Sequence, residues 1–229
     1  MQVLDNIFWN ALTGPQAKFA SGAGDARRFA RGFSPIVGFR DPRLPDFAAL
    51  APYCDPGEHF YCADWTGEAP TGWTIEAEGT MVQMVWDAPV PPPVNDPRLV
   101  PLRPEHAPLA AELAALTRPG PFGPRTTELG EYFGVFDADG RLIAMCGERV
   151  QAAGVREVSG VCTHPQAQGQ GLARLLVNHV VRRQLERGEQ SFLHVMRSNN
   201  GAYGLYSRMG FRTHRECAVR VVAPSSALG

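Results

Sequence analysis

The segment that most constrains the fold is a predicted strand that runs directly into a glycine-rich loop and then into a helix. Residues 155–163 are rich in β-branched residues, and residues 166–171 read Gln-Ala-Gln-Gly-Gln-Gly. Apolar residues at helical spacing follow from Leu172 to about residue 187. This order points backbone N–H groups and the positive end of a helix dipole at one place, which suits a phosphate or pyrophosphate group.

The loop matches neither of two common nucleotide-binding motifs. The chain contains no G-x-x-x-x-G-K-[S/T] sequence, and so no lysine for the terminal phosphates of a nucleotide. The third glycine of the dinucleotide motif is also missing. Glycines still leave the backbone N–H groups open to a ligand, because no side chain covers them. The alternative is an ordinary strand-to-helix turn.

Composition indicates a globular protein with no general attraction to anionic partners. The 229 residues suffice for one large domain or two small ones, and 44% of them are hydrophobic. The 22 basic and 23 acidic residues give a formal net charge of -1, which supports neither nucleic-acid binding nor an anionic membrane surface. We expect no signal peptide and no membrane span, since the N-terminal sequence lacks the first pattern and no long apolar stretch occurs.

The cysteines predict a reducing compartment. The five cysteines are scattered and show no C-x-x-C spacing. We therefore expect neither a metal site nor a disulfide framework, and we expect a cytoplasmic location.

A proline-rich segment at residues 87–97 predicts a domain boundary, because consecutive prolines form a stiff, extended connector. Residues 1–90 are predicted to form an N-terminal accessory α/β domain without a phosphate loop. Its expected helices span 5–12 and 44–53, with a further helical pattern that carries Phe19 and Phe29. Its expected strands span 34–40, 58–65 and 72–86.

The second part, residues 97–223, is predicted to be an α+β domain with a mixed, largely antiparallel sheet flanked by helices. A hairpin is expected across Asp137-Ala-Asp-Gly140, which is a strong turn signal. The other expected strands span 98–103, 155–163, 191–196 and 211–222, and the expected helices span 104–116, 172–187 and 199–208.

Two motifs in this second part resemble the GNAT superfamily of N-acetyltransferases. One is similar to the acyl-CoA signature of that superfamily and reads Val158-x-x-Val161-x-Thr163-x-Pro165-Gln166-x-x-Gly169-x-Gly171-x-Ala173. The other is similar to its second conserved stretch and reads Asn199-x-x-Ala202-x-x-x-Tyr206-x-x-x-Gly210-Phe211. The resemblance implies the GNAT fold, acetyl-CoA as cofactor and direct acyl transfer to an amine. The N-terminal part matches no catalytic motif, so it is expected to be a degenerate copy of the same fold or an accessory lid.

The resemblance also implies which residues bind the cofactor. The CoA pyrophosphate is expected on the backbone amides of Gln168, Gly169, Gln170, Gly171, Leu172 and Ala173. The pantetheine arm is expected to pair like an extra strand with Val161, Cys162 and Thr163, beside a bulge at Gly160. Asn199 is expected to contact the pantetheine, and Gln166 and Ala202 to belong to the same site. Gln168 stands where many family members have arginine, which removes one positive contact to phosphate.

The catalytic residues are predicted in the same way. The resemblance implies that Tyr206 is the general acid for the leaving thiolate; the alternative is an aromatic residue packed on Phe211. An amine nucleophile also needs a base. Glu148 is favoured slightly over Glu157, and the alternative for both is an exposed or salt-bridged carboxylate. His164 is expected to be a surface residue or a phosphate contact rather than the base.

The acceptor is expected beside the loop at residues 117–127, where Arg118, Phe122 and Arg125 are candidate substrate-binding residues. The alternative is a rigid surface loop. We therefore expect an acetyl-CoA-dependent N-acetyltransferase that acts on the primary amine of a small molecule, as a monomer or homodimer. The alternative function is a non-catalytic acyl-CoA sensor, against which the presence of Asn199 and Tyr206 argues.

Overall fold

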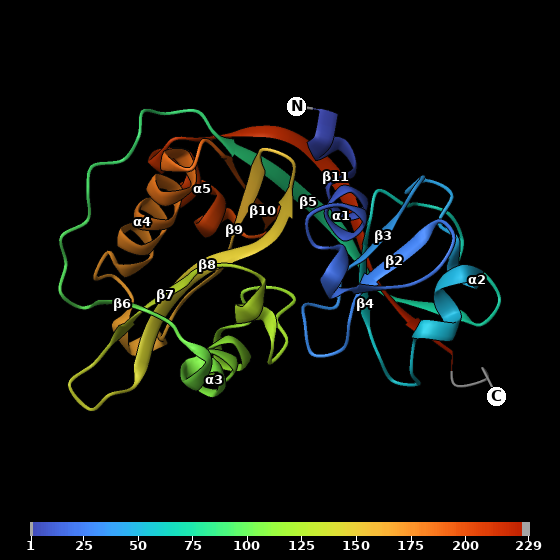
Figure 1. The fold of residues 1–229 in the computed structure, drawn as a ribbon, viewed down its shortest axis with the longest axis horizontal. Helices are drawn as coiled ribbons and strands as arrows, with labels where there is room; N and C mark the ends of the chain where they lie inside the picture. The colour runs from blue at the N-terminus through green and yellow to red at the C-terminus, as the bar shows by residue number, and fades with distance from the viewer. Residues whose placement is uncertain (1, 226–229) are drawn as a thin grey trace.

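An eight-stranded sheet lies at the centre of the computed structural model, which describes residues 2–225. Its strands follow the order β4-β11-β5-β10-β9-β8-β7-β6, and every neighbouring pair is antiparallel except β9 and β10 (Figure 1). The strands are β4 (Phe60–Ala63), β5 (Trp73–Trp86), β6 (Leu99–Pro101), β7 (Tyr132–Phe136), β8 (Leu142–Ala152), β9 (Val155–Thr163), β10 (Gln190–Met196) and β11 (Phe211–Pro224). The expected α+β fold with a largely antiparallel sheet is confirmed.

Helices cover both faces of this sheet. On one face lie α4 (Leu172–Glu186) and α5 (Asn200–Met209), which bury Leu176, Val180 and Tyr206 against the strands. On the opposite face lie α3 (Ala107–Thr117) and α1 (Ile7–Thr13) (Figure 1). Within the described residues, no helix is both long and apolar enough to cross a membrane.

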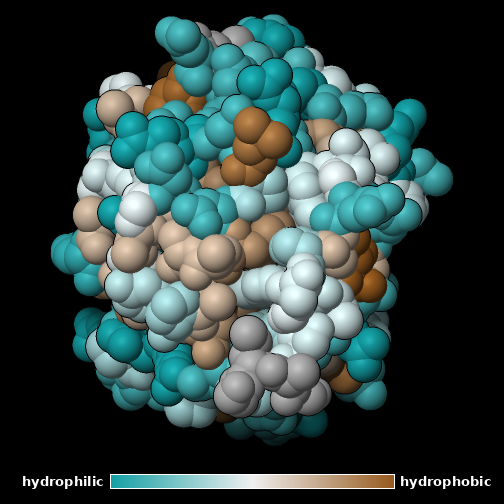
Figure 2. Space-filling model, turned by 90° about the vertical axis from the view of Figure 1, so that its right-hand side faces the viewer, coloured by the Kyte–Doolittle hydropathy of each residue, from teal (hydrophilic) through white to brown (hydrophobic). Residues whose placement is uncertain are grey.

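The rest of the N-terminal part forms a small three-stranded sheet, β1 (Ala20–Ser21), β2 (Ala26–Phe29) and β3 (Val37–Phe39), next to the short helix α2 (Phe47–Leu50). The prediction of a helical segment that carries Phe19 and Phe29 is therefore wrong. Gly22 and Gly24 have φ angles of 137° and 51°, which turn the chain into the β1–β2 hairpin instead. Figure 2 shows the side that carries α2, where hydrophilic residues surround a smaller apolar area.

Short 3-10 helices complete the chain. They are η1 (Gln2–Asn6), η2 (Ala17–Phe19), η3 (Ala51–Tyr53), η4 (Pro104–His106), η5 (Thr126–Leu129) and η6 (Pro165–Ala167). The expected helix at 5–12 corresponds to η1 and α1, and the expected helix at 44–53 to α2 and η3.

Strands from both sides of the proline-rich segment share the large sheet. Strand β5 lies between β10 and β11, and β4 pairs with β11 at the edge. Residues 87–97 then run outside the sheet to β6 at the opposite edge (Figure 1). The division into residues 1–90 and 97–223 stays a prediction, and the two parts are joined by backbone pairing.

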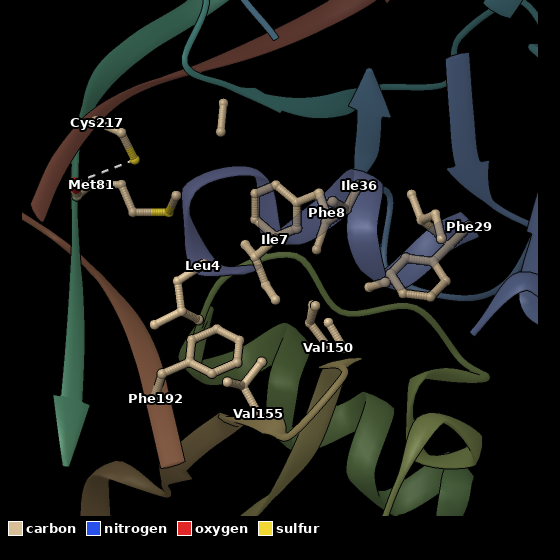
Figure 3. Close-up of a cluster of buried hydrophobic side chains, with 14 of the residues drawn as sticks. Leu4, Ile7, Phe8, Phe29, Ile36, Met81, Val150, Val155, Phe192 and Cys217 are labelled. Atoms are coloured by element: carbon tan, nitrogen blue, oxygen red, sulfur yellow. Dashed lines mark hydrogen bonds between the residues drawn. The ribbon is translucent and has the colours of Figure 1, made fainter. Parts of the chain in front are cut away.

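The N-terminal turn packs into the core on the α1 face of the sheet. Leu4, Ile7 and Phe8 contact a cluster that includes Val155 and Phe192 (Figure 3). Leu4 and Phe192 are 0% exposed. The first turn of the described chain is therefore part of the structure that supports β9 and β10.

We predict that Leu4→Ala destabilises the protein by roughly 2–5 kcal/mol, because it removes fully buried methyl groups and leaves a cavity. Leu44→Ala makes the same chemical change at a residue that is 79% exposed, and it should stay within about 0.5 kcal/mol of wild type. Urea-induced unfolding measures both. Equal effects would show that the N-terminal turn does not stabilise the core.

Candidate active site

The glycine-rich loop joins β9 to the N-terminus of α4. Gly169 and Gly171 have φ angles of 78° and 75°, and a Cβ at either position would meet no atom within 4 Å. Glycine is therefore favoured by the left-handed backbone rather than by crowding. Gly171 is the N-cap of α4, and no described side chain caps the helix. The N–H groups of its first turn are left for another acceptor, as an anion site requires.

A cavity of about 630 Å³ lies against this loop. Its lining comes from the end of β9, the loop, the start of α4 and the start of α5. It contains eight of the predicted cofactor residues, namely Thr163, Gln168, Gly169, Gly171, Leu172, Ala173, Asn199 and Ala202. The two sequence motifs are thus brought together around one space.

Four further residues line the cavity and were missed from the sequence, namely Ala167, Arg174, Gly201 and Leu205. Arg174 is the informative one, because it places an exposed guanidinium beside the loop whose Gln168 lacks a charge. Its position in the first turn of a helix that follows a glycine-rich loop is a signal that could have identified it.

Strands β9 and β10 diverge beside the cavity. Their parallel pairing covers only Val155–Glu157 against Gln190–Phe192. Beyond that point β10 continues to pair with β5, while β9 continues with β8. Gly160 has a φ of 62° and lies at a register shift between β8 and β9, so the expected bulge is confirmed. The outer half of β9 therefore has an open edge toward β10 in the described structure.

Val161, Cys162 and Thr163 lie along this open edge. The Cys162 thiol is buried and donates to the Gly160 carbonyl over 3.2 Å. Burial raises the pKa of this thiol to about 12, so it stays protonated and is a poor nucleophile. Gln166 and Gln170 are exposed on the loop and do not line the cavity.

Asn199 and Tyr206 lie at the two ends of α5. The Asn199 side chain caps the helix and accepts the Ala202 N–H over 3.1 Å. Tyr206 is 8% exposed, and its ring meets Phe211 edge-on with centroids 5.9 Å apart. Burial raises the pKa of the Tyr206 hydroxyl, which keeps it protonated. The role of Tyr206 as general acid stays a prediction.

Glu148 is held in an ion network away from the cavity. It is 2% exposed and contacts Arg156 at 3.2 Å, Gln184 at 3.2 Å and the Arg187 guanidinium. These partners place it near the C-terminal end of α4, whereas the cavity lies at the N-terminal end. Glu148 is therefore a salt-bridged carboxylate, which was the alternative expectation. It does not lie among the residues that line the cavity.

Glu157 lies on the opposite face of the sheet, at the point where β9 and β10 separate. It is fully buried, and its two oxygens accept from Arg149 at 2.9 and 2.7 Å and from His194 Nδ1 at 2.7 Å. Burial alone would raise the pKa of this carboxyl, but Arg149 and His194 outweigh it and lower the pKa to about 2. A carboxylate with so low a pKa is a weak proton acceptor at neutral pH.

Of the three residues predicted in the 117–127 loop, Phe122 alone is shown beside the bulge. Its ring meets Tyr132 edge-on at 6.1 Å, and a Cβ at Gly160 would lie 3.4 Å from it. Arg125 instead pairs with Glu128 and covers the Phe33 ring. Arg118 is exposed, in a left-handed conformation at the end of α3.

Two of the six histidines bear on the site. The His164 ring accepts the Gln166 N–H over 3.3 Å and so caps the short helix η6 at the loop. His194, which the sequence reasoning missed, interrupts the apolar strand Ser-Phe-Leu-His-Val-Met. A titratable residue inside an otherwise apolar strand is the sequence feature that could have identified His194.

Comparisons with known proteins agree with this arrangement. The family model for FR47-like protein matches residues 132–220. A solved structure of a GNAT-family acetyltransferase from Novosphingobium aromaticivorans is 33% identical, with a TM-score of 0.87 over 97% of this chain and 99% of that one. No curated protein matched the chain.

Two more distant solved structures show the same fold. A GCN5-related N-acetyltransferase from Kribbella flavida is 19% identical, with a TM-score of 0.58 over 99% of this chain and 96% of that one. A GCN5-related N-acetyltransferase-like protein from Streptococcus suis is 10% identical, with a TM-score of 0.60 over 97% of each chain.

The Glu157–Arg149 pair predicts a stability change at acid pH. Because the pKa of Glu157 falls from 4.5 to about 2 on folding, its contribution is present above pH 4.5 and is lost as the pH falls toward 2. The stability difference between wild type and Glu157→Gln should therefore shrink by roughly 3 kcal/mol over that range. Urea unfolding at a series of pH values measures it.

Glu216→Gln is the matched control, because Glu216 is 49% exposed and pairs with Arg197 at the surface. Its stability should stay close to that of wild type across the same range. A pH-independent difference for Glu157→Gln would contradict the depressed pKa.

Proposed function

Because this chain belongs to the GNAT family of acetyltransferases, we propose that it transfers the acetyl group of acetyl-CoA to the primary amine of a small molecule, such as an amino acid or a similar metabolite. The family assignment supports acyl transfer from an acyl-CoA. The observation that carries the proposal is the cavity between the glycine-rich loop and α5, next to the open edge of β9.

The residues around the cavity fit the parts of CoA. Backbone N–H groups from Gln168 to Ala173 and the exposed Arg174 suit the pyrophosphate, which is anionic. The open edge of Val161–Thr163 offers unpaired backbone groups to the amide-containing pantetheine arm, as an added strand would use them. When bound, acetyl-CoA supplies an activated acyl carbon and a thiolate leaving group.

Direct transfer to the amine agrees with the chemistry of the buried groups. Cys162 is kept protonated by its burial, so a covalent acyl-thiol route through this residue is disfavoured. Tyr206 is a protonated phenol on the α4–α5 face, and we assign it the role of proton donor to the thiolate that leaves.

The packing of the 117–127 loop supports a small acceptor. Ser34 Oγ donates to the Pro121 carbonyl over 3.0 Å, and the Arg125 N–H donates to Gly32 over 2.7 Å. Arg149 Nη1 also donates to Pro121, over 3.2 Å. The loop is thereby held against β8 and the N-terminal part, and a loop fixed in this way favours a compact acceptor.

A thiol-release assay with acetyl-CoA and a panel of amines tests the function. We expect turnover with one or more small primary amines, together with CoA binding measured by calorimetry. Tight CoA binding without turnover of any acceptor would contradict the proposal and support an acyl-CoA sensor.

We predict that Tyr206→Phe lowers kcat about 100-fold with little change in the KM for acetyl-CoA, because it removes a proton donor but keeps the buried ring. Tyr203→Phe is the matched control on the same helix, since its hydroxyl contacts Thr213 at 3.0 Å on the surface. An unchanged kcat for Tyr206→Phe would exclude the acid role.

A further inference from the structure

Four polar side chains form a buried row across the sheet on the α1 face. Arg149 on β8 holds Glu157 on β9, and Glu157 accepts from His194 on β10 at 2.7 Å. His194 Nε2 lies 3.1 Å from the Gln83 amide nitrogen on β5. The side chains of all four residues are buried. Such a row within an apolar core needs a reason beyond packing.

The row crosses the place where the reaction would occur. Glu157 belongs to the last parallel pair between β9 and β10, and His194 lies two residues beyond Phe192 in that pair, at the edge of the opening. Leu193 and Val195 pack on the Tyr206 face, so His194 projects to the other face. It contacts the rings of Phe8 and Phe192, which extend into the core shown in Figure 3. Tyr206 and His194 therefore approach the opening from opposite sides.

The hydrogen-bond partners assign the protonation state of the imidazole. The Gln83 amide donates to the Leu4 carbonyl over 3.3 Å and to His194 Nε2 over 3.1 Å. Nε2 is then an acceptor, and Nδ1–H donates to Glu157. These contacts describe a neutral imidazole that a carboxylate orients, as is common for general bases, with its Nε2 lone pair engaged by the Gln83 amide.

We propose that His194 is the general base for the acceptor amine and that Glu157 is a positioning residue that acts through it. The proposal rests on the acetyl transfer proposed above. The amine nitrogen forms the new C–N bond with the acetyl carbon as the C–S bond breaks and the thiolate leaves with its electron pair. The Gln83 amide releases Nε2 of His194, the amine gives up its proton to this atom, and the thiolate takes its proton from Tyr206.

The row also accommodates the imidazolium that results. Glu157 faces Nδ1–H and balances the new charge, while Arg149 prevents Glu157 from taking the proton itself. The Gln83 Oε1 atom is buried and has no hydrogen-bond partner in the described structure. Rotation of this amide would present Oε1 as an acceptor for Nε2–H, in exchange for the bond to Leu4.

The guanidinium described beside His194 is paired with a carboxylate. Arg215 on β11, which shares a small cavity lining with His194, binds Asp64 through two hydrogen bonds of 2.8 and 2.7 Å. His214, next to it on β11, lies 3.8 Å from Asp5 in η1. The proton taken up by His194 therefore adds a positive charge whose nearest partner is Glu157.

The test compares His194→Gln with wild type in the amine-dependent thiol-release assay, using the best acceptor of the panel. We expect kcat to fall at least about 100-fold with an unchanged KM for acetyl-CoA. The remaining rate should rise steadily with pH, because the amine must then lose its proton to solvent. His179→Gln is the matched control, since His179 lies on α4 against Phe133, away from the cavity. Its rate should match wild type.

Glu157→Gln separates positioning from catalysis. It should retain more activity than His194→Gln, and the acid limb of its pH–rate profile should move to lower pH, because the imidazolium loses its carboxylate. A profile that keeps its shape in either variant would overturn the proposal.

Nitrogen-detected NMR of the histidine rings tests the assignment in wild-type protein, so it does not depend on variants that fold. We expect a neutral His194 ring at pH 7 with the proton on Nδ1. A proton on Nε2 would overturn the proposal. Absence of wild-type turnover with every amine would remove the proposed function and the base role together, whereas full turnover in His194→Gln would remove the base role alone.

Discussion

The divergence of β9 from β10 is the constraint on which the rest of the structure depends. An exposed strand edge inside a sheet leaves backbone groups unpaired, which is unfavourable unless a partner binds there. Here β10 is retained by β5 and β9 by β8, and the bulge at Gly160 turns the two strands apart. Helix α4 begins after the end of β9 that is separated from β10, and it leads back to the end of β10 that is paired with β9. Its N-terminus must therefore lie beside the opening. One separation of strands thus creates the open edge and places the proposed anion site beside it.

The paired end of the opening is fixed by buried charges. Glu148 on the α4 face and Glu157 on the α1 face are each held by guanidinium groups, and a planar guanidinium can bind both oxygens of a carboxylate at once. Breaking a buried pair leaves an uncompensated charge, so these residues restrain the strands in position. Their engagement in ion pairs leaves His194, which Glu157 and Gln83 orient, as the group proposed to take the proton.

Local patterns were readable from the sequence, and pairings across strands were not. The limits of β9 and the glycine loop follow from residue type and spacing over a short range, and the cavity contains most of the residues assigned from them. Strand order and register, however, decide which faces Glu148 and Glu157 occupy, and neither is encoded in a single segment. The row from Arg149 to Gln83 joins residues from four strands and was invisible for the same reason.

The N-terminal part contacts the proposed base directly. Gln83 reaches His194 from β5 and is itself held by the Leu4 carbonyl, so the first turn of the chain helps to orient the imidazole. The 117–127 loop is fixed to Gly32 and Ser34 of the same part. Substitutions in this part would therefore act on the proposed base and on the 117–127 loop rather than on the start of α4. The proposed acyl-donor site and the proposed base thus lie on opposite faces of the sheet, and the N-terminal part contacts the second.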